Sequence, residues 1–159
     1  MRYLLDSDAF SDLVRGHEHV MTRFSLTDSS LIRISTVTVK EIEYGRRRHP
    51  GQVTRRNARI DSLLEEIEAL PFEIEDAFVT GRIRAALARA GTPIGPYDVM
   101  IAGTALARGL IVVTANTREF SRVPDLQIEN WRLPLNEVRE PPVEYRVVRV
   151  TSVRMSQAA

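Results

Sequence analysis

The sequence contains no cysteine. This absence excludes disulfide bonds, thiolate zinc sites and cysteine nucleophiles together. Long apolar runs are also missing, so we predict no membrane-spanning segment. The first strand candidate begins almost at Met1, with no charged leader and apolar core before it. We therefore expect no signal peptide and a cytoplasmic location.

Lysine is nearly absent, because Lys40 is the only lysine among 22 basic residues and the others are arginines. Arginine favours bidentate contacts with phosphate, which suits a nucleic-acid partner. The codon bias of a GC-rich genome explains the same excess at least as well, and a net charge of +1 adds little. The basic composition by itself therefore identifies no partner.

A chain of 159 residues, 43% hydrophobic and 27% charged, is typical of one globular domain. Apolar patterns predict strands over 3–5, 31–35, 71–74, 110–114 and 126–128, and helices over 9–15, 17–26, 36–48, 53–70, 75–90 and 96–108. A breaker at 49–51 and a loop over 115–124 separate some of them. This alternation predicts an α/β fold whose parallel sheet is covered on both sides.

Residues 132–159 differ in kind from the rest of the chain. They contain Pro134, Pro141 and Pro142, then a β-prone stretch over 143–148, and they end in small polar residues. We expect a mobile or loosely docked tail there in preference to an added strand. The expected domain is therefore 1–131, followed by this tail.

Two acids end the first strand candidate, in the sequence Asp6-Ser7-Asp8. In open α/β sheets the carboxyl ends of the strands form the ligand-binding crevice, so Asp6 stands where chemistry is usually done. The alternative is structural: Ser7 or Asp8 caps the next helix, and Asp6 is a turn residue.

Further acids follow at Glu41, Asp98 and Glu119, with Asn116 near the last. The helix that carries Asp98 is apolar on nearly every face, so its first turn is expected to be buried, and a buried acid needs a partner. Clustered carboxylates repel one another unless protons or cations intervene. Without cysteine, and with three histidines in no ligand-like pattern, the natural cation is Mg²⁺ or Mn²⁺. Two such ions can clamp a phosphodiester during hydrolysis.

Five segments carry a resemblance to a known family: residues 3–8 (YLLDSD), 34–45 (ISTVTVKEIEYG), 81–87 (GRIRAAL), 92–98 (TPIGPYD) and 113–120 (VTANTREF). In this order and spacing they make the sequence similar to PIN-domain ribonucleases of the VapC toxin family over residues 1–131. The resemblance implies a Rossmann-like α/β/α sandwich with a central, mainly parallel sheet. It also implies a Mg²⁺- or Mn²⁺-dependent endoribonuclease that cuts tRNA or rRNA.

The same resemblance implies roles for single residues. Asp6, Glu41 and Asp98 are the implied metal-binding acids, Glu119 or Asn116 the fourth, and Thr114 lines the pocket. Asp8 stands where the family often has Asn, which adds negative charge near the metals. The implied partners are a VapB-type antitoxin, a second copy of the chain and, through the antitoxin only, operator DNA. The tail after residue 131 exceeds the usual family length.

Two arginine clusters, Arg46-Arg47-Arg48 and Arg55-Arg56 with Arg59, could contact RNA phosphates, although a solvated helix face explains them equally well. We expect the groove beside the acids to read RNA shape and single-stranded loops. DNA stays open as a substrate, because the acids treat both phosphodiesters alike. One alternative is a haloacid-dehalogenase-type phosphatase, since Asp6-Ser7-Asp8 fits its nucleophile and acid pair. The other is a catalytically weak PIN module that acts through its antitoxin.

Overall fold

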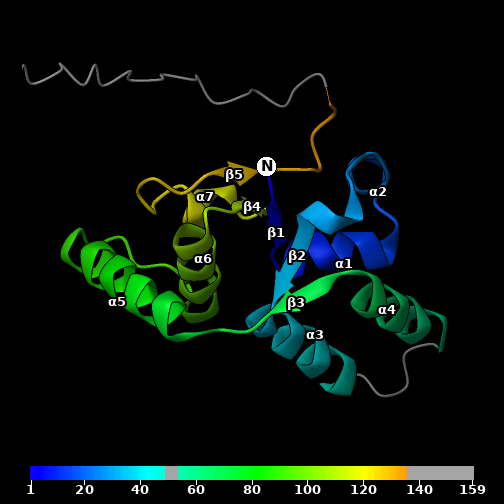
Figure 1. The fold of residues 1–159 in the computed structure, drawn as a ribbon, viewed down its shortest axis with the longest axis horizontal. Helices are drawn as coiled ribbons and strands as arrows, with labels where there is room; N and C mark the ends of the chain where they lie inside the picture. Colours follow the sequence, from blue (N-terminus) through cyan, green and yellow to red (C-terminus); the bar gives the residue numbers. More distant parts are fainter. Residues whose placement is uncertain (49–53, 136–159) are drawn as a thin grey trace, which may run out of the picture.

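A computed structural model of the chain describes residues 1–48 and 54–135 (Figure 1). The strands are β1 (Tyr3–Leu5), β2 (Ile32–Ser35), β3 (Glu68–Leu70), β4 (Ile111–Val113) and β5 (Ile128–Glu129). The helices are α1 (Ser7–Arg15), α2 (Glu18–Leu26), α3 (Thr36–Arg48), α4 (Thr54–Glu66), α5 (Ile74–Arg89), α6 (Pro96–Arg108) and α7 (Thr117–Phe120), with a 3-10 turn, η1, at Ser29–Leu31. In the part of the chain so described, no helix is long and apolar enough to span a bilayer.

All five strands are parallel and lie in the order β3-β2-β1-β4-β5. The chain moves outward from β1 to β2 and β3, then returns to the other side of β1 for β4 and β5. The strand order therefore reverses at β1 and β4, and a crevice opens at such a point beyond the carboxyl ends of the strands. The expected parallel sheet is confirmed.

The sheet separates two hydrophobic cores. In β1, Leu4 faces the core built with α5 and α6, and Leu5 faces the core built with α1, α2 and α4. Figure 1 shows these helix groups on opposite sides of the sheet, which confirms the α/β/α sandwich. Helix α3 serves both cores, because Val37 belongs to the first and Ile42 packs against the second. Residues of α3 thus lie at the edge where the two layers meet.

The third strand is not where the sequence pattern put it. The helix expected over 53–70 ends at Glu66, and β3 runs from Glu68 to Leu70 instead of over 71–74. Pro71 has no N–H for a strand ladder, and the Phe72 N–H donates to the Thr36 hydroxyl at 3.2 Å instead of to a neighbouring strand. A second correction concerns the loop expected over 115–124, which contains the short helix α7.

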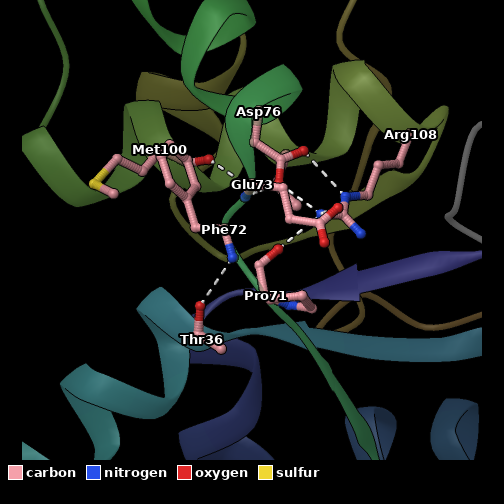
Figure 2. Close-up of polar contacts among 8 residues, drawn as sticks. Thr36, Pro71, Phe72, Glu73, Asp76, Met100 and Arg108 are labelled. Carbon is pink, nitrogen blue, oxygen red and sulfur yellow. Dashed lines mark hydrogen bonds and ion pairs between the residues drawn. The ribbon is translucent and has the colours of Figure 1, made fainter.

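Helices α5 and α6 pack very closely. A Cβ at Gly103 would lie 1.9 Å from the Thr80 hydroxyl oxygen and 3.0 Å from the Thr80 Cα. Only glycine allows this approach. At the far end of α6, Arg108 donates to both carboxylate oxygens of Asp76, at 3.0 and 2.6 Å, and to the Pro71 carbonyl at 2.7 Å. Figure 2 shows this guanidinium joining α6 to the start of α5.

The end of the described chain is attached to α1. Trp131 is buried beside Tyr3, with the two ring centroids 5.2 Å apart. Arg132 donates two hydrogen bonds to Asp12 of α1, at 2.6 and 3.0 Å. The expected tail therefore begins with a docked residue, and its remainder from 136 lies outside the described residues. The breaker expected at 49–51 lies outside them too.

Candidate active site

Asp6 follows β1 directly and begins α1. Its Oδ1 accepts a hydrogen bond from the Ala9 N–H at 2.8 Å, so Asp6 is itself the N-cap of α1. The structural alternative, which made Ser7 or Asp8 the cap of this helix, is wrong on the cap, because the chain turns into α1 one residue earlier. The Asp6 residue is only 4% exposed, and this burial raises the pKa of its carboxyl to about 7.

Asp98 lies in the first turn of α6, where Pro96 takes the first helical position. The Asn116 amide donates to Asp98 Oδ2 at 3.3 Å. Partial burial raises the pKa of Asp98 to about 6, and the Glu119 carboxylate beside it adds to the rise. The helix N-terminus favours a negative charge there, yet desolvation and repulsion outweigh this effect.

Glu119 and Asn116 both reach Asp98 from the segment after β4. The Gly95 N–H donates to Glu119 Oε2 at 3.0 Å, which fixes the Glu119 side chain above the start of α6. A Cβ at Gly95 would lie 3.2 Å from Asp98 Oδ2, so glycine keeps this approach open. The structure thus brings both candidates for the fourth position against the same carboxylate.

Glu41 comes from α3 and meets the start of α1. The Ser7 hydroxyl donates a short hydrogen bond to Glu41 Oε2, and the Glu41 charge contributes to the raised pKa of Asp98. A cavity of about 80 Å³ opens beside this bond, lined among others by Phe10, Gly45 and Arg56. Glu41 therefore lies between the acids at the strand ends and an open hollow in the surface.

The two expected pocket residues next to Asp6 take part in the same cluster. Thr114, 1% exposed directly after β4, hydrogen-bonds the Asp6 carboxyl and also accepts from the Asn116 N–H at 2.9 Å. Asp8 is exposed in the first turn of α1, and its charge contributes to the raised pKa values of both Asp6 and Asp98. Carboxylates from the start of α1 and from α3, α6 and α7 therefore act on one another.

The donor set fits a hard divalent cation. Asp6, Glu41, Asp98 and Glu119 offer only oxygen, the atom that Mg²⁺ and Mn²⁺ prefer. Within 1–48 and 54–135, no arginine or lysine forms an ion pair with Asp6, Asp98 or Glu119. In the same ranges no three acid or histidine side chains are yet arranged to enclose a metal ion. To bind one cation together, these side chains would have to turn toward one another. Without a cation, the repulsion between the carboxylates opposes this movement.

The arginines of α3 are engaged with acids. Arg46 pairs with Asp61 at 2.8 Å, and Arg47 pairs with Glu43 at 2.7 Å. Both pairs are at least partly exposed, and such pairs contribute little to stability. Contact of Arg46, Arg47 and Arg48 with RNA stays a prediction, and for the first two it requires phosphate to displace a carboxylate.

Several neighbours of the acids escaped the sequence analysis. Ser7 holds Glu41, and Gly95 holds Glu119. Lys40 and Tyr97 also meet at the site, with the Lys40 Nζ 3.1 Å from the Tyr97 ring centroid. Only their closeness in sequence to the acids could have indicated these residues, because each lies within three positions of an acid.

Comparison with known proteins places these residues in a family context. A model of the PIN domain matches residues 3–126. The tRNA(fMet)-specific endonuclease VapC of Salmonella typhimurium is 41% identical over 132 residues, which cover 82% of this chain and 98% of that protein. The crystal structure of DNA-bound VapBC from the same organism matches with a TM-score of 0.73 at 40% identity, over 82% of this chain and 98% of that one. VapBC2 of Rickettsia felis, bound to a DNA fragment from its promoter, matches with a TM-score of 0.75 at 28% identity, covering 82% and 99%.

Proposed function

The chain belongs to the PIN-domain family, in its VapC group, and on that premise we propose that it is a metal-dependent endoribonuclease toxin that hydrolyses tRNA or rRNA. Its relative in Salmonella typhimurium is named for cleavage of tRNA(fMet), which makes tRNA the first substrate to try. Membership of this family also argues against the phosphatase alternative, because the PIN-domain match covers the segment in which Asp6 and Asp8 lie.

One observation carries the proposal: Asp6 and Asp98 lie where the strand order reverses, the Asp98 charge acts on Asp6, and both carboxyls have raised pKa values. Burying ionisable acids beside one another costs free energy, and the chain supplies neither of them with an ion-pair partner in its described part. Mg²⁺ or Mn²⁺, when bound, would relieve this repulsion, stabilise charge on the phosphodiester and acidify a water molecule.

The chain's own residues position the ligands. Asp6 is held by the Ala9 N–H and the Thr114 hydroxyl, and Asp98 by the Asn116 amide. Glu41 is held by Ser7, and Glu119 by the Gly95 N–H. Asp6, Glu41 and Asp98 would bind the cation, and Glu119 is the better fourth ligand because a carboxylate binds Mg²⁺ more strongly than an amide oxygen does.

The partners follow from the relatives as part of the same proposal. The Salmonella typhimurium and Rickettsia felis structures are VapBC complexes bound to DNA. We expect a VapB-type antitoxin to bind this chain, a homodimer to form, and operator DNA to be bound only through the antitoxin.

The test is cleavage of total bacterial RNA by the purified chain with Mg²⁺ or Mn²⁺, followed by mapping of the cut sites. EDTA is one control and Asp6→Asn the other, since Asn preserves the N-cap of α1 whereas Ala would remove it at a cost of about 1 kcal/mol. We expect discrete cuts that both controls abolish. RNA and DNA of equal sequence, offered in competition, separate the two substrates.

A thermal shift with the same ions tests binding without catalysis. A ligand that binds only the folded state stabilises it by about 1.4 kcal/mol at ten times its dissociation constant. We expect Mn²⁺ to raise the melting temperature of the natural chain and to have little effect on Asp6→Asn. A folded protein that binds Mn²⁺ but cuts no RNA would be a PIN module that acts through its antitoxin.

A further inference from the structure

Lys40 of α3 and Tyr97 of α6 form a contact at the edge of the acid cluster. The Lys40 Nζ lies 3.1 Å from the centre of the Tyr97 ring, a cation–π geometry. Lys40 is exposed, and Tyr97 is 43% exposed although one face of its ring is covered by the ammonium. An aromatic ring and a cation are therefore both accessible at one point of the surface.

Each member of this pair is adjacent in sequence to one of the acids. Lys40 directly precedes Glu41, and Tyr97 directly precedes Asp98. Successive residues of an α-helix point about 100° apart, so the two contacts lie next to each other between the same two helices. The Glu41 charge acts on Asp98, and the Lys40 ammonium acts on the Tyr97 ring. A ligand bound at Glu41 and Asp98 therefore has Lys40 and Tyr97 beside it.

The charges around the site give this pair a role in binding. A nucleic acid that approaches Asp6, Asp8, Glu41, Asp98 and Glu119 meets negative charge, and Arg46 and Arg47 are held by other acids. Lys40 instead contacts a neutral ring, which it can leave for a phosphate at little cost, because an exposed cation–π contact is weak. A tyrosine ring with free surface is the kind of platform on which unpaired bases stack.

We propose that Lys40 and Tyr97 bind the nucleotide beside the cut: the Tyr97 ring stacks on an unpaired base, and the Lys40 ammonium contacts the adjoining phosphate. This inference rests on the proposed ribonuclease function and names the residues that would hold an unpaired nucleotide of a loop or end. Duplex RNA keeps its bases stacked inside the helix, so it offers the Tyr97 ring nothing to bind.

The first test uses the fact that Lys40 is the only lysine. Reductive methylation modifies this side chain and the N-terminal amine, which serves as an internal reference. In EDTA, where the RNA stays uncut, a single-stranded oligonucleotide is expected to slow the modification of Lys40 at least threefold, and a duplex of the same sequence to leave it unchanged. Equal modification with and without the single strand would overturn the inference.

The two proposals fail separately in this design. Protection of Lys40 without cleavage in Mn²⁺ would leave the binding site standing and reject the nuclease. Cleavage without protection would leave the nuclease standing and reject the role of Lys40 and Tyr97.

The second test measures the affinity for single-stranded RNA in EDTA. Tyr97→Leu is expected to weaken binding about tenfold, because stacking on one base is lost, whereas Tyr97→Phe is expected to stay within twofold. Phe78→Leu is the matched control, since Phe78 is an aromatic 62% exposed on α5, away from the acids. Replacing the stacked base by an abasic site should lower the RNA affinity of the natural chain by the same factor. The same replacement should not lower the affinity of Tyr97→Leu any further.

Lys40→Met completes the set. Loss of one phosphate contact should reduce the slope of log affinity against log salt by about 0.7, and Lys40→Arg should restore it. Arg84→Met on α5 is the matched loss of an exposed cation and should leave the slope unchanged. If Tyr97→Leu and Lys40→Met lower only the melting temperature, the contact merely joins α3 to α6, and the inference is wrong.

Discussion

Two sets of buried or partly buried aspartates have pKa values shifted in opposite directions. Asp12 and Asp76 are 3% and 1% exposed. Burial alone would raise their pKa values, but hydrogen bonds from Arg132 and Arg15 to Asp12, and from Arg108 to Asp76, outweigh it and hold both pKa values below the usual range. Among the described residues no arginine hydrogen-bonds Asp6 or Asp98, and their pKa values rise to about 7 and about 6.

The difference separates acids that join elements of the fold from the acids that we propose as cation ligands. Arg108 ties α6 to the start of α5, and Arg132 ties the end of the described chain to α1. In the described part of the chain Asp6 and Asp98 form no ion pair, although Arg132 acts on Asp6 at longer range, and the desolvation and repulsion that raise their pKa values cost stability. The sequence has 21 arginines, yet none in the described ranges 1–48 and 54–135 pairs directly with Asp6 or Asp98, and this contrast supports the proposed site.

The largest effect is expected from Asp98→Asn, which removes a charge from the site and retains its shape. The side-chain oxygen can still accept from the Asn116 amide. We expect RNA cleavage to fall about 1,000-fold, or about 4 kcal/mol of transition-state stabilisation, because a proposed metal ligand is lost. The rate is measured under single turnover with saturating Mn²⁺.

The stability of the same variant should not fall with its activity. Loss of the repulsion between Asp98 and Glu119 should leave the melting temperature in EDTA unchanged or higher. A marked fall in melting temperature would mean that the Asp98 charge is stabilised within the fold, and the contrast with Asp76 would disappear.

Arg108→Met tests the structural side of the comparison. It leaves the Asp76 carboxylate, 1% exposed, without its cation, and breaking such a pair costs about 3 kcal/mol. Urea unfolding measures the loss, and cleavage by the folded fraction should be unchanged. Adding Asp76→Asn to this variant should recover part of the stability, because the amide needs no counter-charge and still accepts from the Glu73 N–H. No recovery would show that the loss came from packing.

Much of the fold could be predicted because its signals are local. The parallel sheet follows from short apolar strands that alternate with helices, and Asp6 and Asp98 could be placed because each adjoins a strand or an apolar helix. The strand over 71–74 was wrong because Pro71 and its apolar neighbours resemble an edge strand. The real strand, Glu68–Leu70, is fixed by pairing with β2, a contact distant in sequence.

The parts of the site that could not be predicted depend on contacts between distant segments. Ser7 and Glu41 are 34 residues apart, and Gly95 and Glu119 are 24 apart. The sequence offers 21 arginines and 21 acids with no indication of which ones meet. The distinction between a paired and an unpaired aspartate therefore appears only in three dimensions.

The smallest effect is expected from Arg132→Gln, at the attachment of the chain end to Asp12. The Arg132 side chain is 39% exposed and Asp12 keeps its pair with Arg15, so we expect a loss of about 1 kcal/mol or less. Unfolding in urea at neutral pH measures this loss, and Arg118→Gln, at an exposed arginine of α7, is the control with no expected change.

The pH dependence of that loss identifies its cause. Because the pKa of Asp12 is lower in the folded chain than in the unfolded chain, its ionised form stabilises the fold above about pH 4. This contribution disappears as the pH falls through the folded pKa. The difference between Arg132→Gln and the natural chain should therefore be greatest at neutral pH and shrink below pH ~4. A difference that persists in acid would show that Arg132 acts by packing of its aliphatic part, and Asp12 would then owe its lowered pKa to Arg15.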